Sequence, residues 1–168
     1  MKLKSAATAM ITFLGLGVFA NNALADWYFV HGHSGHVEQM PGGGSSFAAK
    51  AGGLEVKPDF DESTWIHYSV PTNADAAYGV RYVQLKFNIL QSIDSHISHV
   101  NIYNGDLLVK SFAVNWNTPG YQFKTLDLKQ IRTFARGLGV SIEINASFDA
   151  GSDVYSFIGV GADVVAKP

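Results

Sequence analysis

A regular alternation of apolar and polar residues is the feature that most limits what this chain can fold into. Residues 82–89 read YVQLKFNI, in which every second residue from Val83 onward is apolar. Side chains of a β-strand point alternately to its two faces, so this pattern gives one apolar face and one face in water. Residues 140–148, VSIEINASF, repeat it. Both segments are therefore predicted to be half-buried strands.

Similar signals occur along most of the chain. Runs rich in β-branched and aromatic residues, bounded by turn residues, predict further strands at about 27–31, 36–39, 64–70, 98–103, 107–113, 121–126 and 154–165. Asn104-Gly105 lies between two of these runs and favours a tight hairpin turn. The segment 126–139 fits either a short helix or a strand leading into the next one. The glycine-rich segment 41–53, PGGGSSFAAKAGG, has the composition of a loop, since its glycines do not favour a packed strand.

Strands with one apolar face predict an all-β fold, in which two antiparallel sheets pack as a β-sandwich of jelly-roll or immunoglobulin-like type. A closed β-barrel is the alternative. Helical segments do not intervene between the strands, which argues against a parallel α/β fold. The chain has no cysteine, so apolar packing and not disulfides must hold the sheets together, and 47% of its residues are hydrophobic.

Residues 1–25 have the pattern of a secretory signal peptide. Lys2 and Lys4 precede an apolar run, and Ala23-Leu24-Ala25 precedes Asp26 as a cleavage site. The apolar run is too short for a transmembrane helix, which needs about 20 residues. We expect a secreted or periplasmic protein with a single domain at residues 26–168. A formal net charge of −2 without basic clusters argues against nucleic acid as a partner.

Five short motifs follow one another along the chain: WYFVHGH, WIHYSVPT, VNIYNGD, GLGVSIEINASF and GVGADV. In this order they resemble an uncharacterised bacterial and fungal family of small all-β domains of unknown function. The matching residues are His31, Gly32, Trp65, His67, Pro71, Gly139, Ser141, Gly161, Ala162 and Asp163. This chain has His33 where the family tends to have Asn. The resemblance implies the fold and supplies no activity.

The motif HGHSGH holds three of the six histidines, namely His31, His33 and His36. Imidazole nitrogens are ligands for Zn²⁺, Cu²⁺ and Ni²⁺, but no zinc motif of fixed spacing is present. We interpret the motif first as a loop between strands and second as a divalent-metal site. Two acidic segments, 59–63 and 149–153, offer oxygen ligands for Ca²⁺ without the spacing of an EF-hand.

Four residues are candidates for binding a ligand. Trp65 and His67 share one face of the strand predicted at 64–70, and Trp116 and Tyr121 lie in NWNTPGY, which mixes aromatic and amide side chains. An aromatic ring with polar groups at its rim suits a polar ligand such as a sugar. The alternatives are that His67 is a packed histidine with one hydrogen bond and that Trp116 covers the open end of the sandwich.

The sequence lacks a catalytic constellation. It has no cysteine and no G-x-S-x-G motif, and nothing in it positions a pair of carboxylates. We therefore name no catalytic residue and no cofactor beyond the divalent metal. We expect an exported binding protein whose ligand is a carbohydrate or a protein surface. The alternatives are a metal-binding protein using the HGHSGH histidines and a structural protein that assembles through its sheet edges. The sequence gives no oligomeric state.

Overall fold

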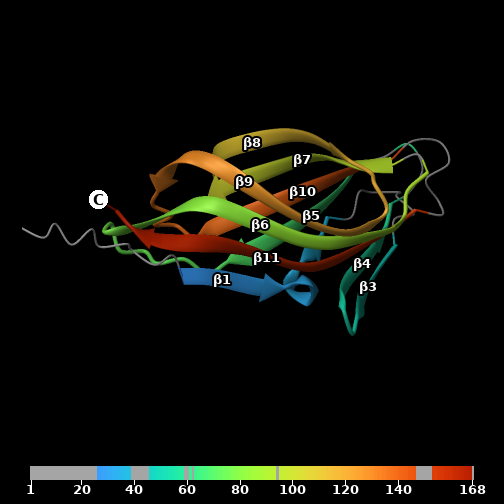
Figure 1. The fold of residues 1–168 in the computed structure, drawn as a ribbon, viewed down its shortest axis with the longest axis horizontal. Helices are drawn as coiled ribbons and strands as arrows, with labels where there is room; N and C mark the ends of the chain where they lie inside the picture. The colour runs from blue at the N-terminus through green and yellow to red at the C-terminus, as the bar shows by residue number, and fades with distance from the viewer. Residues whose placement is uncertain are drawn as a thin grey trace, which may run out of the picture.

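The computed structural model describes residues 26–38, 46–58, 61, 63–93, 95–146 and 153–167. The strands among them are β1 (Asp26–His31), β2 (His36–Val37), β3 (Ser46–Lys50), β4 (Gly53–Lys57), β5 (Ser63–Val70), β6 (Tyr78–Gln91), β7 (Ser95–Asn104), β8 (Leu107–Trp116), β9 (Gly120–Arg132), β10 (Leu138–Ala146) and β11 (Val154–Ala166) (Figure 1). A short 3₁₀ helix, η1 (Gly32–Ser34), joins β1 to β2. No helix in these ranges is long and apolar enough to span a membrane.

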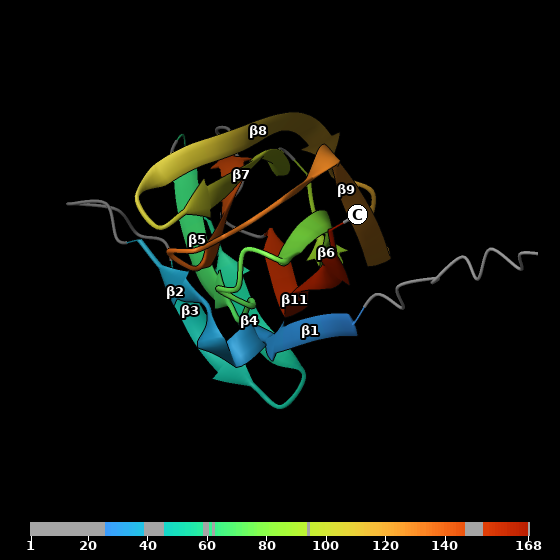
Figure 2. The same ribbon diagram turned by 90° about the vertical axis from the view of Figure 1, so that its left-hand side faces the viewer.

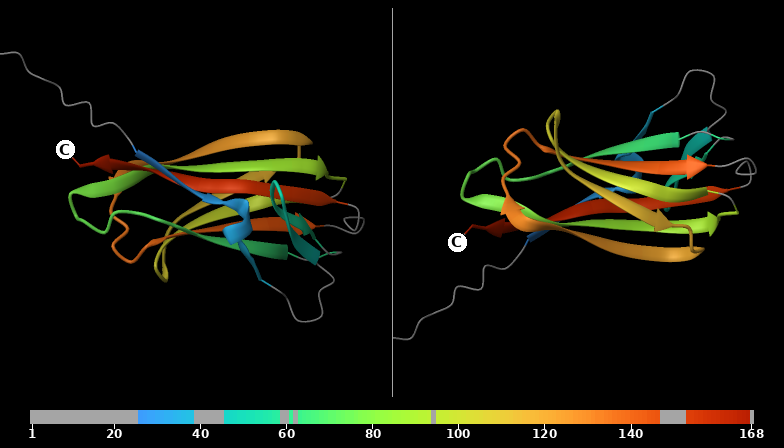
Figure 3. Two further views of the ribbon diagram at one scale, coloured as in Figure 1. Left: turned by 90° about the horizontal axis from the view of Figure 1, so that it is seen from below. Right: turned by 90° about the horizontal axis from the view of Figure 1, so that it is seen from above.

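The strands form two sheets. The six-stranded sheet has the order β3-β4-β11-β6-β9, with β1 also paired to β11, and the five-stranded sheet has the order β2-β5-β10-β7-β8. All strand pairs are antiparallel. Figure 2 shows the two layers end-on, and Figure 3 shows β1 beside β11. The predicted β-sandwich is confirmed, and the barrel alternative is wrong because the sheets remain separate.

The apolar side chains of the alternating segments meet between the two sheets. On β6, Val83, Leu85 and Phe87 are at most 1% exposed, and they face a similar row on β10 that contains Val140 and Ile142. Packing in such a core is dense, and its burial supplies most of the stabilisation. The alternation predicted from the sequence is therefore confirmed on both strands.

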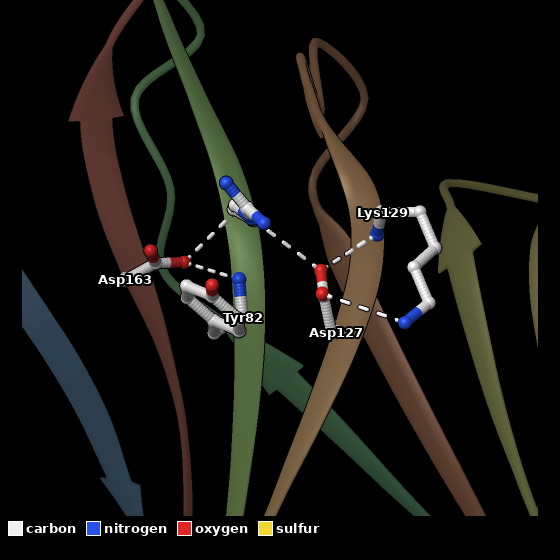
Figure 4. A network of polar contacts seen from close by, with 5 residues as sticks. Tyr82, Asp127, Lys129 and Asp163 are labelled. Carbon is white, nitrogen blue, oxygen red and sulfur yellow. Dashed lines mark hydrogen bonds and ion pairs between the residues drawn. The ribbon is translucent and has the colours of Figure 1, made fainter.

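A buried carboxylate stabilises an irregular part of the six-stranded sheet (Figure 4). The pairing of β6 with β9 shifts around Arg81, and there the Oδ1 atom of Asp163 on β11 accepts hydrogen bonds from the backbone N–H groups of Arg81 and Tyr82. Burial raises the pKa of Asp163, and these N–H donors act in the opposite direction. On the outer side, the Arg81 Nε donates to Asp127 at 3.4 Å, and the backbone N–H of Lys129 donates to the same carboxylate at 2.7 Å. The aspartate of the GVGADV motif thus has a structural role.

The structure describes two turn regions for which the sequence made predictions. The hairpin between β7 and β8 is confirmed, and its turn residues are Gly105 and Asp106. Gly105 has a φ of 62°, which glycine adopts readily. The segment 126–139 forms no helix, because β9 continues to Arg132 and a turn leads to β10.

The prediction that residues 41–53 form a loop is wrong for the second part of that segment. Ser46–Lys50 form β3, which pairs with β4 from Gly53 onward, whereas residues 41–45 lie outside the described ranges. All five residues of β3 are exposed. The composition of a segment indicates whether its side chains can pack in a core. β3 needs no such packing, because pairing of its backbone with β4 holds it at the edge of the sheet.

Candidate functional site

The outer face of the five-stranded sheet carries the polar residues that alternate with its core residues. The strand registers place one residue from each strand in a single row across the sheet, and this middle row consists of His36, His67, Ser141, Asn101 and Ser111. Because cross-strand neighbours lie about 5 Å apart, these side chains can act on one ligand together.

Two further rows flank the middle row. One contains Trp65, Glu143, His99 and Ala113, and the other contains Ser69, Gly139, Tyr103 and Leu108. We call the three rows together the polar face. An aromatic residue therefore stands on each side of the middle row. Trp65 and Tyr103 are two strands and four residues apart, which corresponds to roughly 16 Å between their Cα atoms.

His67 is held at both ring nitrogens. Its Nδ1 lies 2.8 Å from the Ser141 Oγ, and its Nε2 lies 3.2 Å from the Glu38 Oε2. A carboxylate only accepts, so Nε2–H donates to Glu38, and in the neutral imidazole Nδ1 accepts from the Ser141 hydroxyl. The structure thus gives His67 two hydrogen bonds, one more than the packed-histidine alternative assumed.

This chain of residues has the composition of a Ser–His–acid triad. Catalysis by such a triad also needs free N–H donors that stabilise an oxyanion beside the nucleophile. Ser141 is 6% exposed and lies within β10, which is paired on both sides, so the backbone N–H groups around it belong to the sheet. The arrangement orients the His67 imidazole toward the outer surface.

A second histidine–carboxylate pair lies on the same face. The Glu143 Oε2 is 2.5 Å from the Ser98 Oγ and 2.7 Å from the His99 Nδ1. Burial alone raises the pKa of Glu143, but the hydrogen bonds from Ser98 and His99 outweigh it and lower the pKa. An irregular pairing between Ile97 and His99 shifts the alternation of β7. As a result His96 and His99 both lie on the outer side, although two residues three positions apart on a regular strand point to opposite sides.

An open depression of about 350 Å³ lies on the polar face, between His67 and Ser141 on one side and Tyr103 and Asp106 on the other. Its floor is Gly139, which stands between Ser69 and Tyr103 in the cross-strand row and has no side chain to fill the space. The hollow therefore exists because a glycine occupies this position of β10.

The depression continues into a second one of about 280 Å³ that also includes Gly139 and reaches Arg136. At the rim, the Arg136 Nη1 donates to the Asp106 Oδ1 at 3.1 Å. In the middle row, the Oδ1 atom of Asn101 is buried and has no hydrogen-bond partner within the described ranges. The groove thus combines polar side chains, among them His67 and Asp106, with the aromatic ring of Tyr103.

The structure separates the four ligand-binding candidates. Trp65 and His67 lie on the polar face, whereas Tyr121, 81% exposed, lies on β9 of the other sheet. Trp116 turns inward and stacks on Phe87, with ring centroids 5.8 Å apart and planes inclined by 22°. Trp116 therefore packs against the core. Only the first two candidates can share a ligand.

The HGHSGH motif forms the connection between the sheets, as its interpretation as a loop predicts. Its glycines permit close packing: a Cβ atom at Gly32 would lie 1.7 Å from the carbonyl oxygen of Phe157, and one at Gly35 would lie 2.6 Å from the Tyr68 ring. The buried Tyr68 hydroxyl donates to the Gly32 carbonyl at 3.3 Å. Burial also raises the pKa of Tyr68.

The histidines of this motif do not converge. The rings of His31 and His33 lie 4.4 Å apart, the His33 Nε2 contacts the carbonyl oxygen of Lys50, and His36 pairs across the strands with His67. Among the described residues, no group of three or more histidine or acidic side chains could hold a metal ion. The metal site at His31, His33 and His36 stays a prediction.

The two segments considered for calcium, 59–63 and 149–153, lie largely outside the described residues. Asp153 is described and buried. Its carboxylate accepts hydrogen bonds from the Ser95 hydroxyl at 2.5 Å and from the Ile93 N–H at 2.8 Å. It therefore has partners inside the fold.

Comparisons with known proteins concern the fold. No protein-family model matches the chain, and a search of curated proteins finds no match. Solved structures with a similar fold include three carbohydrate-binding modules. A family 36 module in complex with calcium and xylotriose is 14% identical, with 79% of this chain and 96% of that chain covered and a TM-score of 0.44. A family 61 module in complex with β-1,4-galactotriose is 12% identical (82% and 91% covered, TM-score 0.49), and a family 29 module is 8% identical (83% and 89%, 0.49).

These scores assign neither a ligand nor a binding residue to this chain. Export, the single-domain boundary and the resemblance to an uncharacterised family stay predictions.

Proposed function

We propose that this chain is a non-catalytic carbohydrate-binding domain that holds a glycan across the polar face of its five-stranded sheet. The observation that carries the proposal is the groove over Gly139, which is bounded by Tyr103 and by the oriented His67 imidazole. A pyranose ring presents an apolar C–H face that packs on an aromatic ring and hydroxyl groups that need polar partners at its edge. The groove supplies both.

The electrostatics of the polar face favour an uncharged glycan. Its carboxylates already have hydrogen-bond partners: Asp106 accepts from Arg136, and Glu143 accepts from His99 and Ser98. A ligand with a formal charge would have to compete with these pairs, whereas sugar hydroxyls can add hydrogen bonds to them.

The modules named above bind sugars according to their own descriptions, and the proposal for this chain rests on its own surface. Trp65 and His67 belong to the proposed site. Tyr121 lies on the opposite sheet and therefore serves as a control.

Isothermal titration calorimetry of the purified protein against a panel of neutral oligosaccharides, including xylotriose and galactotriose, tests the proposal. Tyr103→Ala is expected to weaken the binding constant about twofold to tenfold, because stacking on an aromatic ring contributes about 0.5–1.5 kcal/mol beyond buried area. Tyr121→Ala is expected to leave binding unchanged. Absence of binding to every neutral glycan, or an equal loss in both variants, would refute the proposal.

A further inference from the structure

The outer face of the six-stranded sheet differs in chemistry from the polar face. Here the ammonium group of Lys86 on β6 lies 4.1 Å from the centroid of the Phe29 ring on β1 and 5.4 Å from that of Phe123 on β9. Phe29 is 40% exposed and Phe123 is 57% exposed. A cation held against two exposed rings is attracted by the negative ring faces.

A trough over Gly159 of β11 lies beside this cation. Gly159 is the cross-strand neighbour of Lys86, and Gly161 is covered by the Phe29 ring, which a Cβ atom at Gly161 would approach to 2.4 Å. The depression has a volume of about 300 Å³ and is lined by Phe29, Val30, His31, Lys86, Ile158 and Gly159. Ligand sites for small molecules begin at about 300 Å³.

The charge of Lys86 is available to a ligand. Within the described ranges it forms no ion pair, whereas Lys50 pairs with Glu55 and Lys129 pairs with Asp127. Lys86 is also half-buried, so part of its hydration is already removed. A partly desolvated ammonium without a carboxylate partner interacts more strongly with an incoming anion than a fully hydrated one does.

We propose that this trough binds a carboxylated sugar, such as a uronate residue of an acidic glycan. The apolar face of the sugar ring packs on Phe29 and Phe123, and its carboxylate pairs with the Lys86 ammonium. The proposal extends the proposed function to a second site, because the trough and the polar face lie on opposite sides of the sandwich. The first site suits neutral glycans, and the second requires a negative charge.

Calorimetric titration with oligogalacturonate tests the trough, and the fully methyl-esterified oligomer is the matched uncharged probe. Lys86→Gln keeps a polar side chain, one atom shorter, and removes its charge, so it is expected to weaken oligogalacturonate binding about tenfold. Methyl esterification should produce a similar loss in the wild type. Phe123→Ala should also weaken binding, and added salt should reduce it.

Lys124→Gln is the control variant. Lys124 also lies over an aromatic ring, that of Trp116 at 5.5 Å, but it pairs with the inward-facing Leu85 and lies away from the trough. It should change binding less than twofold. Tyr103→Ala should weaken neutral glycans only, so failure at the trough and failure at the polar face can be told apart.

Three results would overturn the inference. They are unchanged affinity in Lys86→Gln, loss of oligogalacturonate binding in Tyr103→Ala, and binding to phosphatidylglycerol vesicles without binding to oligogalacturonate. The last would show that the cation and the rings serve an anionic membrane surface instead.

Discussion

Replacing Gly139 by alanine separates ligand binding from stability. The residue forms the floor of the groove on the polar face, and its backbone has no positive φ that a side chain would strain. A Cβ atom there would lie 3.3 Å from the Cβ of Tyr103, its one close contact. Gly139→Ala therefore adds a methyl group to the floor of the groove while the fold needs to move by only a few tenths of an ångström.

The two effects on stability nearly cancel. Alanine in place of glycine within a strand stabilises by about 0.5–1 kcal/mol through lower entropy of the unfolded chain. The tight contact with Tyr103 costs a similar amount, since overpacking by one methyl group starts at about 1 kcal/mol. The net change should stay within about 1 kcal/mol, or about 4 °C in Tm for a domain of this size.

The affinity for the glycan should change much more than the stability does, because the added methyl group keeps a sugar ring from resting on the floor of the groove. We expect Gly139→Ala to weaken the neutral glycan about tenfold, and Gly139→Val to weaken it further. Calorimetry measures the affinity, and thermal unfolding followed by circular dichroism measures Tm. A stable Gly139→Ala variant with unchanged affinity would show that the groove is not the binding site. An unfolded variant would show that the 3.3 Å contact had been underestimated.

The other predictions concern the fold. Gly32→Ala should destabilise by more than about 3 kcal/mol, since its Cβ would overlap the Phe157 carbonyl oxygen, and thermal unfolding measures the loss. Trp116→Ala should cost about 3 kcal/mol because its ring packs on the core, and Tyr121→Ala should cost less than about 0.5 kcal/mol in the same denaturation assay. The lowered pKa of Glu143 contributes stability above pH 4.5, and this contribution disappears as the pH falls through the pKa of the folded state. Urea unfolding should therefore show that the wild type is more stable than Glu143→Gln at neutral pH and loses this difference in acid.

Local patterns predicted the strands and their faces well. The alternation in β6 and β10 identified core residues such as Leu85 and Ile142, because each strand has a period of two whatever its neighbours are. The same signal was present around Trp116, which shares its alternation with Phe112 and Val114 and packs with them on the core. The mixed aromatic and amide composition of residues 115–121 favoured a surface role for Trp116, so composition was less informative than alternation at this residue.

The candidate site could not be assembled from local patterns. Tyr103, Gly139 and His67 meet because β10 lies between β5 and β7, and this order follows from packing between distant parts of the chain. Alternation also fails at a bulge, because one extra residue reverses every face that follows: strict alternation would place His96 and His99 on opposite faces. Register and bulges are set by tertiary contacts, so a single sequence does not reveal them.

The position of β11 has a consequence for how the molecule is built during synthesis. It is the last of the described strands, yet it lies inside the six-stranded sheet and pairs with β1, β4 and β6. The strands of the five-stranded sheet have all been synthesised once the chain reaches Ala146, whereas β1, β4 and β6 of the other sheet still lack their shared partner β11. Nascent chains that stop before Val154 would leave one edge of each of the strands β1, β4 and β6 unpaired. Such chains should be prone to aggregate or to be bound by chaperones.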